Sequence, residues 1–391
     1  MSRAQRYDDV VVTAPVTVPY VRHSSDGAHW FVARALEGIL QQSHLVKDDL
    51  DGLCLSSFTL APDTAVGLTQ HLGLSLRWLD NIPMGGASGV VALRRALRAV
   101  QSGDASIVAC VAADTNQIDT FRDTLGNFSR FSQDAVYPYG AGGPNASFAF
   151  LTAHYMRTYG ARREDFGKLC VAQRTNALRI PHSLFNKPLT LQEYMEARPI
   201  AEPLHLFDCV MPCAGAEAFL VMRKGRAVDL GLRFAEVLAT MERHNAFPDD
   251  PIQTRGGWAL DRDELFAQAG VRHDDIDLLQ TYDDYPVISL IQIEDLGFCA
   301  KGEGPGFVRD HAFTVDGDFP LNTCGGQLSM GQAGAAGGYL GLTEAVRQIT
   351  GAPLGAAAVP NARVALVSGF GMINYDRGLC CGAAILAGGG T

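Results

Sequence analysis

The sequence lacks runs of basic residues and long apolar segments. Its 32 Lys and Arg against 42 Asp and Glu give a formal net charge of −10, and no cationic run exceeds an Arg-Arg pair. Nucleic-acid and polybasic membrane roles therefore have little support, because both need clustered positive charge. No apolar stretch has the length of a membrane span, and the N-terminus has no signal-peptide pattern. We expect a cytoplasmic protein.

Metal-binding motifs are also missing. The nine cysteines contain no CxxC pair, and the histidines show no pairing pattern. Cys209 and Cys213 form a CxxxC pair, but no second pair or histidine motif completes a tetrahedral zinc site. We therefore expect reduced thiols and no metal.

With 391 residues, 47% of them hydrophobic, the chain can bury the core of two domains or of one fold built from two halves. Short apolar strands alternate with helical periods, which predicts an α/β fold. The expected strands are 8–15, 50–57, 106–115, 232–243, 276–283 and 363–371, and the expected helices are 27–45, 86–102, 261–270 and 331–351.

The two halves contain similar sequence segments. "LVKDDLDGLCL" (45–55) matches "GVRHDDIDLLQ" (270–280), which indicates a duplicated unit. We expect these two strands to lie side by side, with the glycine-rich helix starts at Gly86 and Gly331 close together. The predicted domains are an N-terminal half (1–115), a loop and cap region completing it (116–230) and a C-terminal half (231–391).

The stretch "NIPMGGASGVVALRRALRAV" (81–100) opens as a glycine-rich turn and continues as an amphipathic helix. A helix N-terminus favours an anion or an activated nucleophile. The turn offers only the hydroxyl of Ser88. It is therefore either a packing joint or a site from which a reactive residue is missing.

Four motifs carry a family resemblance: "GGASG" (85–89), "PIAEPLHLFDCVMPCAGAEAF" (199–219), "YDDYPVISLIQIEDLGFCAKGEGPGFV" (282–308) and "LNTCGGQLSMGQAGAAGG" (321–338). Together with the duplication, the chain resembles the thiolase superfamily, specifically the sterol-carrier-protein-type thiolases. The resemblance implies the thiolase fold, a duplicated five-layer αβαβα arrangement with an inserted cap domain.

The catalytic residues of thiolases are not carried over. Gly86 stands where thiolases have the nucleophilic cysteine of a Cys-x-Ser-Gly turn, and Gly331-Gln332-Ala333 replaces their Gly-His-Pro motif. The third residue of the family's site falls near Val367 and Ser368. All three residues needed for Claisen chemistry are therefore missing.

The chain resembles a branch that lacks the nucleophile and acts as acyl-CoA aldolases on steroid side chains, commonly with an OB-fold and zinc-ribbon (DUF35-type) partner. The resemblance implies retro-aldol cleavage of a β-hydroxyacyl-CoA to a ketone or aldehyde and a shorter acyl-CoA. It also implies a homodimer and no cofactor beyond the coenzyme A of the substrate. A second helix-start tyrosine of such relatives appears here as Gln332.

Retro-aldol chemistry needs an acid or base and donors to the enolate oxygen. The candidates are Tyr282, Asp283 and Tyr285, in a tetrad at a strand end, and Gln332 at a helix start. Alternatively, the tyrosines only pack there and the aspartates cap the helix beginning near Pro286.

Substrate-binding candidates are the two helix starts and a loop of the cap: Gly86, Ser88, Gly331, Tyr137 and Tyr139. A helix cap is the simpler interpretation for Ser88, and loop packing is the simpler one for the tyrosines.

Two other functions stay open. The chain could be a non-catalytic thiolase-like carrier or scaffold. It could also be an acyltransferase with a relocated nucleophile, for which Cys324, Cys380 and Cys381 are the candidates.

Overall fold

The computed structural model describes residues 6–116, 121, 129–141 and 143–389. The N-terminal half contains β1 (Val10–Val21), α1 (Ala28–Ser43), β2 (Gly52–Ser56), α2 (Ala65–Leu72), β3 (Trp78–Asn81), α3 (Ser88–Ser102), β4 (Ile107–Thr115), β7 (Ala214–Arg223) and α9 (Lys224–Asp229). The C-terminal half contains β8 (Phe234–His244), α10 (Trp258–Ala269), β9 (Leu278–Gln280), α11 (Pro286–Asp295), α12 (Gly304–Asp310), α13 (Gly326–Met330), α14 (Gly337–Ile349), β10 (Val364–Asn374) and β11 (Arg377–Gly388).

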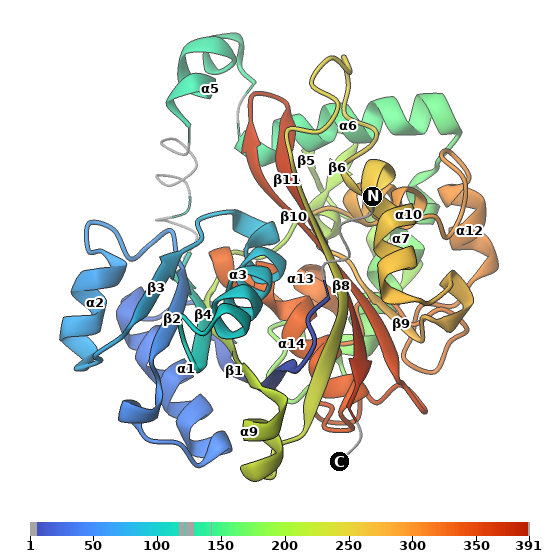
Figure 1. The fold of residues 1–391 in the computed structure, drawn as a ribbon. Coiled ribbons are helices and arrows are strands. Elements are labelled where there is room, and N and C mark those ends of the chain that lie inside the picture. The colour runs from blue at the N-terminus through green and yellow to red at the C-terminus, as the bar shows by residue number, and fades with distance from the viewer. Residues whose placement is uncertain (1–5, 117–120, 122–128, 142, 390–391) are drawn as a thin grey trace.

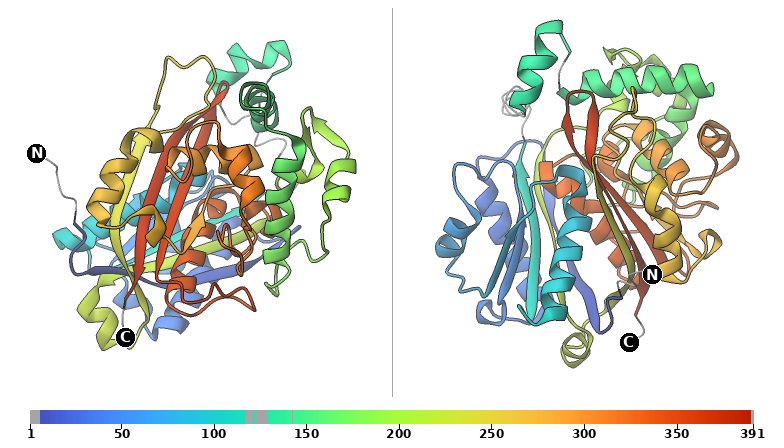
Figure 2. Two further views of the ribbon diagram at one scale, coloured as in Figure 1. Left: turned by 90° about the vertical axis from the view of Figure 1, so that its right-hand side faces the viewer. Right: turned by 45° about the horizontal axis from the view of Figure 1, so that its top comes forward.

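The strands run in the order β3-β2-β4-β7-β1-β8-β11-β10-β9. The first five come from the N-terminal half and the last four from the C-terminal half. Only a short antiparallel pairing, Val11–Thr13 of β1 against Phe234–Glu236 of β8, joins the two groups. Figure 1 and Figure 2 show the two groups as facing layers with α3 and α14 between them.

Three hydrophobic clusters fill the spaces between layers. The central one surrounds α3 and α14, one lies under α1, and one lies between the C-terminal strands and α10 and α11. The apolar residues of α3 recur at helical spacing and therefore share one face of the helix. This face is buried in the central cluster. This is the expected five-layer αβαβα order.

The sequence repeat has a structural counterpart. Asp49 and Asp275 each accept a hydrogen bond from the backbone N–H three residues earlier, at 2.8 Å in both halves. Asp51 accepts from Ile107 at the start of β4, as Asp277 accepts from Val364 at the start of β10. The repeated aspartates therefore fix each strand to its neighbour in the same half.

The structure corrects the expected pairing of the repeated strands. β2 and β9 lie at opposite sides of the strand order, not side by side. Each packs within its own half, and the halves meet through β1 and β8 instead. The starts of α3 and α14 do meet, because a Cβ at Gly338 would lie 3.0 Å from Gly86 Cα, whereas a Cβ at Gly331 would meet Leu184 and Cys213.

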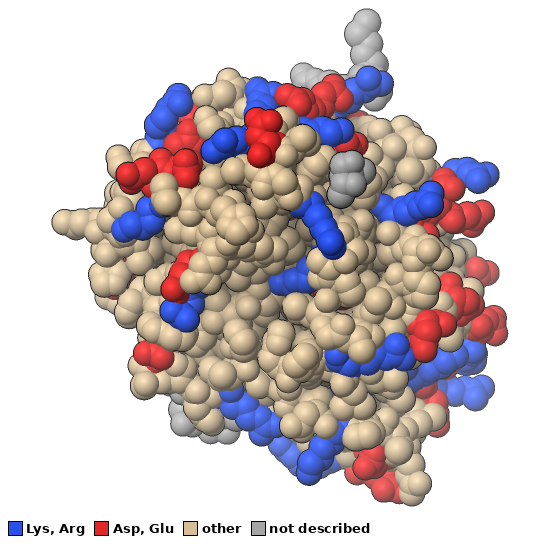
Figure 3. All heavy atoms as spheres, turned by 90° about the horizontal axis from the view of Figure 1, so that it is seen from below, with Lys and Arg blue, Asp and Glu red and all other residues tan. Residues whose placement is uncertain are grey.

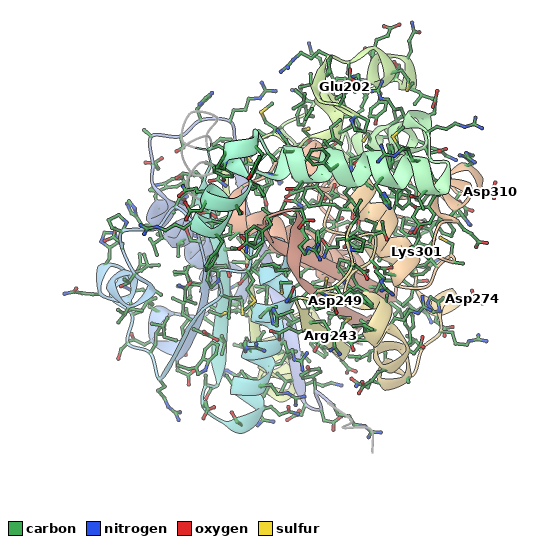
Figure 4. All side chains as sticks on the ribbon, turned by 90° about the horizontal axis from the view of Figure 1, so that it is seen from above. Glu202, Arg243, Asp249, Asp274, Lys301 and Asp310 are labelled. Atoms are coloured by element: carbon green, nitrogen blue, oxygen red, sulfur yellow. The ribbon has the colours of Figure 1, made fainter. Side chains whose placement is uncertain are left out.

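The cap contains α5 (Arg130–Ala135), α6 (Gly143–Tyr159), α7 (Arg163–Ala177), α8 (Leu191–Glu196), β5 (Pro199–Ala201) and β6 (Leu204–His205). Helix α6 crosses the top of the molecule in Figure 1 and is seen from above in Figure 4. None of the helices in the described ranges combines the length and apolarity that a membrane span requires.

The predicted helix 331–351 begins later than expected. Gly331, with φ of 111°, follows α13, and α14 starts only at Gly337. Between them, the backbone N–H of Ala335 donates to the buried carboxylate of Asp114, at the end of β4, at 2.7 Å. The same carboxylate accepts from Ser57, Phe58 and Thr59. Asp114 therefore ties the helix start of one half to the strand ends of the other.

We predict that Asp114→Asn lowers the free energy of unfolding by about 2–4 kcal/mol, because the amide nitrogen cannot accept the hydrogen bonds that one carboxylate oxygen receives. Urea unfolding followed by circular dichroism measures the loss. Asp263→Asn, at a side chain 94% exposed, is the control and should stay within about 0.5 kcal/mol. Equal stability of both variants would contradict the role of Asp114.

Candidate active site

A cavity opens where the two helix starts meet, with an empty volume of about 700 Å³, part of it open to solvent. The wall is mainly apolar, and α6 contributes Pro144 and Phe148 from above. The lining residues are Phe58, Gly85, Gly86, Asn116, Phe121, Pro144, Phe148, Tyr282, Asp284, Ile288, Gln332, Gly334, Phe370, Gly371, Met372, Ile373 and Gly378.

The turns before α3 and α14 have the same build. Each is a 3₁₀ turn, Gly85–Ala87 and Gly334–Ala336, that begins at a glycine with positive φ. Their backbones are in such close contact that a Cβ at Gly89 would lie 2.2 Å from the carbonyl oxygen of Gly338. Only glycine lets the two turns approach this far.

The ring of Tyr282 occupies the space beside Gly86. A Cβ built on Gly86 would lie 2.0 Å from Cε2 of Tyr282 and 2.3 Å from the carbonyl oxygen of Phe370. The position that resembles the thiolase nucleophile therefore has no room for a side chain while Tyr282 holds this orientation. The phenol takes the place of the missing thiol at the cavity wall.

The side chain of Gln292 fixes the backbone of Tyr282. Its Oε1 accepts from the N–H of Tyr282 at 3.1 Å, and its Nε2 donates to the carbonyl oxygen at 2.7 Å. Ser368 also donates to Oε1, at 2.6 Å. This links the β9–α11 loop to β10 and orients the Tyr282 ring.

Asp284 is the acidic group of the cavity, and the sequence analysis did not select it. Its Oδ2 accepts from the Tyr282 hydroxyl at 2.7 Å, and its Oδ1 is buried without a hydrogen-bond partner in the described part of the chain. Burial raises the pKa of Asp284 to about 7, the bond from Tyr282 opposes the rise, and the Asp283 carboxylate adds to it. A signal was present: alternate residues after a strand share a face, which groups Tyr282 with Asp284.

Asp283 points away from the cavity. Its carboxylate accepts from the backbone N–H of Gln327 at 2.9 Å and of Leu328 at 3.3 Å, at the start of α13, and from Nε2 of Gln173 at 2.9 Å. Burial raises the pKa of this carboxyl to about 6, and these donors oppose the rise. Neither aspartate caps the helix at Pro286, which has no side-chain cap.

Gln332 lines the cavity, and backbone hydrogen bonds hold its segment on both sides. Its N–H donates to the carbonyl oxygen of Met211 at 2.8 Å, and its own carbonyl accepts from Cys213 at 3.1 Å. Burial raises the pKa of Tyr282 well above its ordinary value, the carboxylate of Asp284 adds to this, and the hydrogen-bonding side chain of Gln332 lowers it.

Asn116 is a second lining residue that the sequence analysis missed. Its side chain is buried, and its Oδ1 has no hydrogen-bond partner in the described ranges. No motif identifies it, because it is one of several consecutive polar residues in the sequence, Asp114 to Gln117.

The other candidates lie outside the cavity wall. Tyr285 donates to Oδ1 of Asn145 at 2.6 Å and stacks on Phe148. Ser88 is buried, donates to the carbonyl oxygen of Ile82 and accepts from the N–H of Met84, so it closes the turn before α3. Gly331 packs against Leu184.

Tyr137 and Tyr139, in a 3₁₀ turn of the cap, are also absent from the cavity wall, and Tyr139 is 86% exposed. Among the described residues, no cysteine lines the cavity. Burial raises the pKa of Cys380 to about 12 and also raises the pKa of Cys324 and Cys381, so these thiols are not activated. Cys380 and Cys381 lie in β11.

Charged groups lie mostly at the periphery. On the face seen in Figure 3, basic and acidic side chains are mixed around the margin, and uncharged atoms cover most of the centre. The labelled residues Glu202, Asp274 and Asp310 lie near the rim of the view in Figure 4.

Comparisons with known proteins agree with this geometry. Residues 242–380 match the family model of the thiolase C-terminal domain. The chain is 32% identical over 340 residues (82% of it, 86% of the relative) to the 17-hydroxy-3-oxo-4-pregnene-20-carboxyl-CoA lyase of Mycobacterium tuberculosis. It is 31% identical over 339 residues (81% and 84%) to the steroid side-chain-cleaving aldolase of Thermomonospora curvata.

Solved structures show the same fold. An Ltp2-ChsH2(DUF35) aldolase superposes with a TM-score of 0.82 at 26% identity, covering 97% of this chain and 98% of that one. The acetyl-CoA acetyltransferase of Syntrophomonas wolfei superposes with a TM-score of 0.72 at 15% identity, covering 97% and 99%.

We predict that Gly86→Cys produces no acyl-enzyme with acetoacetyl-CoA and disables the site, because the new side chain and the Tyr282 ring need the same space. Intact-mass spectrometry checks for the adduct. Gly225→Ala, where an added Cβ meets nothing within 4 Å, is the control and should behave like wild type. A stable adduct at residue 86 would show that the tyrosine ring moves aside.

Proposed function

The chain belongs to the thiolase-fold family that includes steroid side-chain-cleaving aldolases, and on this premise we propose that Tyr282 and Gln332 serve a retro-aldol cleavage in the cavity between the helix starts. The substrate is a β-hydroxyacyl-CoA with a steroid-like ring system, and the products are a ketone or aldehyde and a shorter acyl-CoA. The observation that carries the proposal is the ring of Tyr282 packed against Gly86, where a thiolase needs its thiol.

The cavity suits this chemistry. Retro-aldol cleavage needs no nucleophile, but it needs a group that exchanges a proton with the β-hydroxyl and donors for the enolate oxygen. Tyr282 supplies a hydroxyl at the wall, Gln332 supplies a neutral amide, and the phenylalanines suit an apolar ring system. The carrier alternative leaves this polar group in an apolar cavity without a purpose, and the acyltransferase alternative lacks an activated thiol.

We further propose assembly as a homodimer and with an OB-fold and zinc-ribbon partner. The similar Ltp2-ChsH2(DUF35) aldolase includes a DUF35 component, which supports the partner. The dimer is supported by β3, which ends the strand order and leaves Leu79 exposed, because an uncovered strand edge can pair with a second copy.

The edge strand can be tested directly. Leu79→Lys should shift the protein from dimer toward monomer, because a charged side chain disfavours edge-to-edge pairing. Sedimentation velocity measures the mass, and Val66→Lys, at an exposed position on α2, is the control. A dimer unaffected by Leu79→Lys would place the interface elsewhere.

For the reaction, Tyr282→Phe should lower the rate of cleavage by about 10²–10⁴-fold without unfolding the protein, because it removes the hydroxyl of the acid–base pair that Tyr282 forms with Asp284. The assay follows release of the shorter acyl-CoA from 17-hydroxy-3-oxo-4-pregnene-20-carboxyl-CoA, with and without the zinc-ribbon partner.

Tyr285→Phe is the paired variant, because its hydroxyl binds Asn145 outside the cavity wall. It should change the rate by less than about tenfold. Full activity of Tyr282→Phe would remove Tyr282 from the mechanism, and absence of cleavage by wild type with its partner would favour the carrier.

A further inference from the structure

The unpartnered oxygen of Asp284 needs an explanation. A buried polar atom without a hydrogen-bond partner is costly and is rarely kept without a role. The Oδ1 atom of Asp284 is such an atom among the described residues, and Asp284 lines the cavity. Its other oxygen accepts a hydrogen bond from the hydroxyl of Tyr282 at 2.7 Å, so Tyr282 fixes the carboxylate and leaves Oδ1 as the oxygen without a protein partner.

The chemistry of the retro-aldol cleavage determines which role a carboxylate in the cavity can have. A retro-aldol reaction moves one proton from the β-hydroxyl oxygen to the α-carbon and consumes none overall. One group that accepts the proton and then returns it is therefore sufficient. It must be populated in both protonation states near neutral pH, which the pKa of about 7 allows.

We propose that Asp284 is the catalytic proton carrier of the retro-aldol cleavage, an inference that rests on the proposed function. Its Oδ1 takes the proton of the β-hydroxyl as the carbon–oxygen double bond forms and the bond between the α- and β-carbons breaks. The electron pair of that bond passes into the thioester enolate. The protonated Asp284 then returns the proton to the α-carbon, and its carboxylate is restored.

The neighbouring aspartate cannot take this role in the observed arrangement. Four protein donors hold the Asp283 carboxylate, and it lies outside the cavity wall. The two residues therefore have different surroundings: Asp283 binds the start of α13, and Asp284 lines the cavity.

The first test removes the charge. Asp284→Asn should lower the rate of cleavage by about 10²–10⁴-fold. In wild type, kcat/KM should rise with pH through about 7, because Asp284 must be deprotonated to accept a proton. Asp284→Glu should keep this acid limb at a reduced rate, whereas Asp284→Asn should lose it. Asp263→Asn is the control with unchanged activity.

The second test needs no steroid. Wild type should exchange the α-hydrogens of propionyl-CoA with D₂O, measured by mass spectrometry, because the proton return is reversible. Asp284→Asn should lower the rate of this exchange by about 100-fold or more, the contribution of a positioned base. Asp283→Asn should lower Tm but keep the acid limb of the cleavage profile.

A stability measurement separates a proton carrier from a structural carboxylate. An unfolded Asp has a pKa of about 3.9. The folded protein therefore holds a proton that the unfolded chain releases between about pH 4 and 7, so this residue makes stability fall as pH rises through that window. Asp284→Asn lacks this fall and should have a higher Tm than wild type above pH 7.

The outcomes are distinguishable. If wild type cleaves the steroid thioester and Asp284→Asn cleaves it as fast, the assignment of Asp284 is wrong while the proposed function stands. A lower Tm for Asp284→Asn above pH 7, with an unchanged acid limb, would make Asp284 only structural. If wild type neither cleaves nor exchanges, both the function and this inference fail.

Discussion

The site depends on the backbone contact between two glycine-containing turns, Gly85–Ala87 and Gly334–Ala336, and the helices that they start. A Cβ at Gly338 would lie 2.5 Å from the carbonyl oxygen of Gly85, and one at Gly89 would overlap the carbonyl of Gly338. Because the turns touch directly, the cavity forms at the seam between the halves and receives residues from both. Asp114 holds this seam from below by accepting from the loop after β2 and from Ala335 of the opposite half.

The same contact explains why a tyrosine and a glycine occur together. The space beside Gly86 is bounded by the backbone of Phe370 and is filled by the Tyr282 ring. A nucleophile at 86 and a phenol at 282 exclude each other in this arrangement. A thiol at position 86 and the ring of Tyr282 would therefore fill the same space. The two kinds of chemistry can differ in which of these groups is present while the thiolase fold stays the same.

The features that could be predicted from the sequence are those that depend on interactions between residues close together in the chain. The aspartates of 45–55 and 270–280 act on backbone within a few residues, so their repeat predicted two equivalent units. The pairing of strands is not local, and β2 and β9 were wrongly expected side by side. The delayed start of α14 depends on Asp114, which is 221 residues away from Ala335 in the chain.

The aspartate pair shows the same limit at the site. In the sequence, only the alternation that groups Asp284 with Tyr282 separates the two neighbouring aspartates. What distinguishes them is the start of α13, whose free N–H groups hold Asp283, because a carboxylate is stabilised at a helix N-terminus. The alternation along the loop then turns Asp284 toward Tyr282.

This division also explains how the cavity can work with neutral donors. Burial sets the pKa of Asp284, and no cation contributes to it among the described groups that act on the carboxyl. If Asp284 takes up the hydroxyl proton as the enolate forms, the negative charge passes from carboxylate to enolate and the total charge of the cavity stays constant. The enolate and the Asp284 carboxylate are therefore not charged at the same time, and the neutral amide of Gln332 and phenol of Tyr282 are sufficient as donors in the cavity.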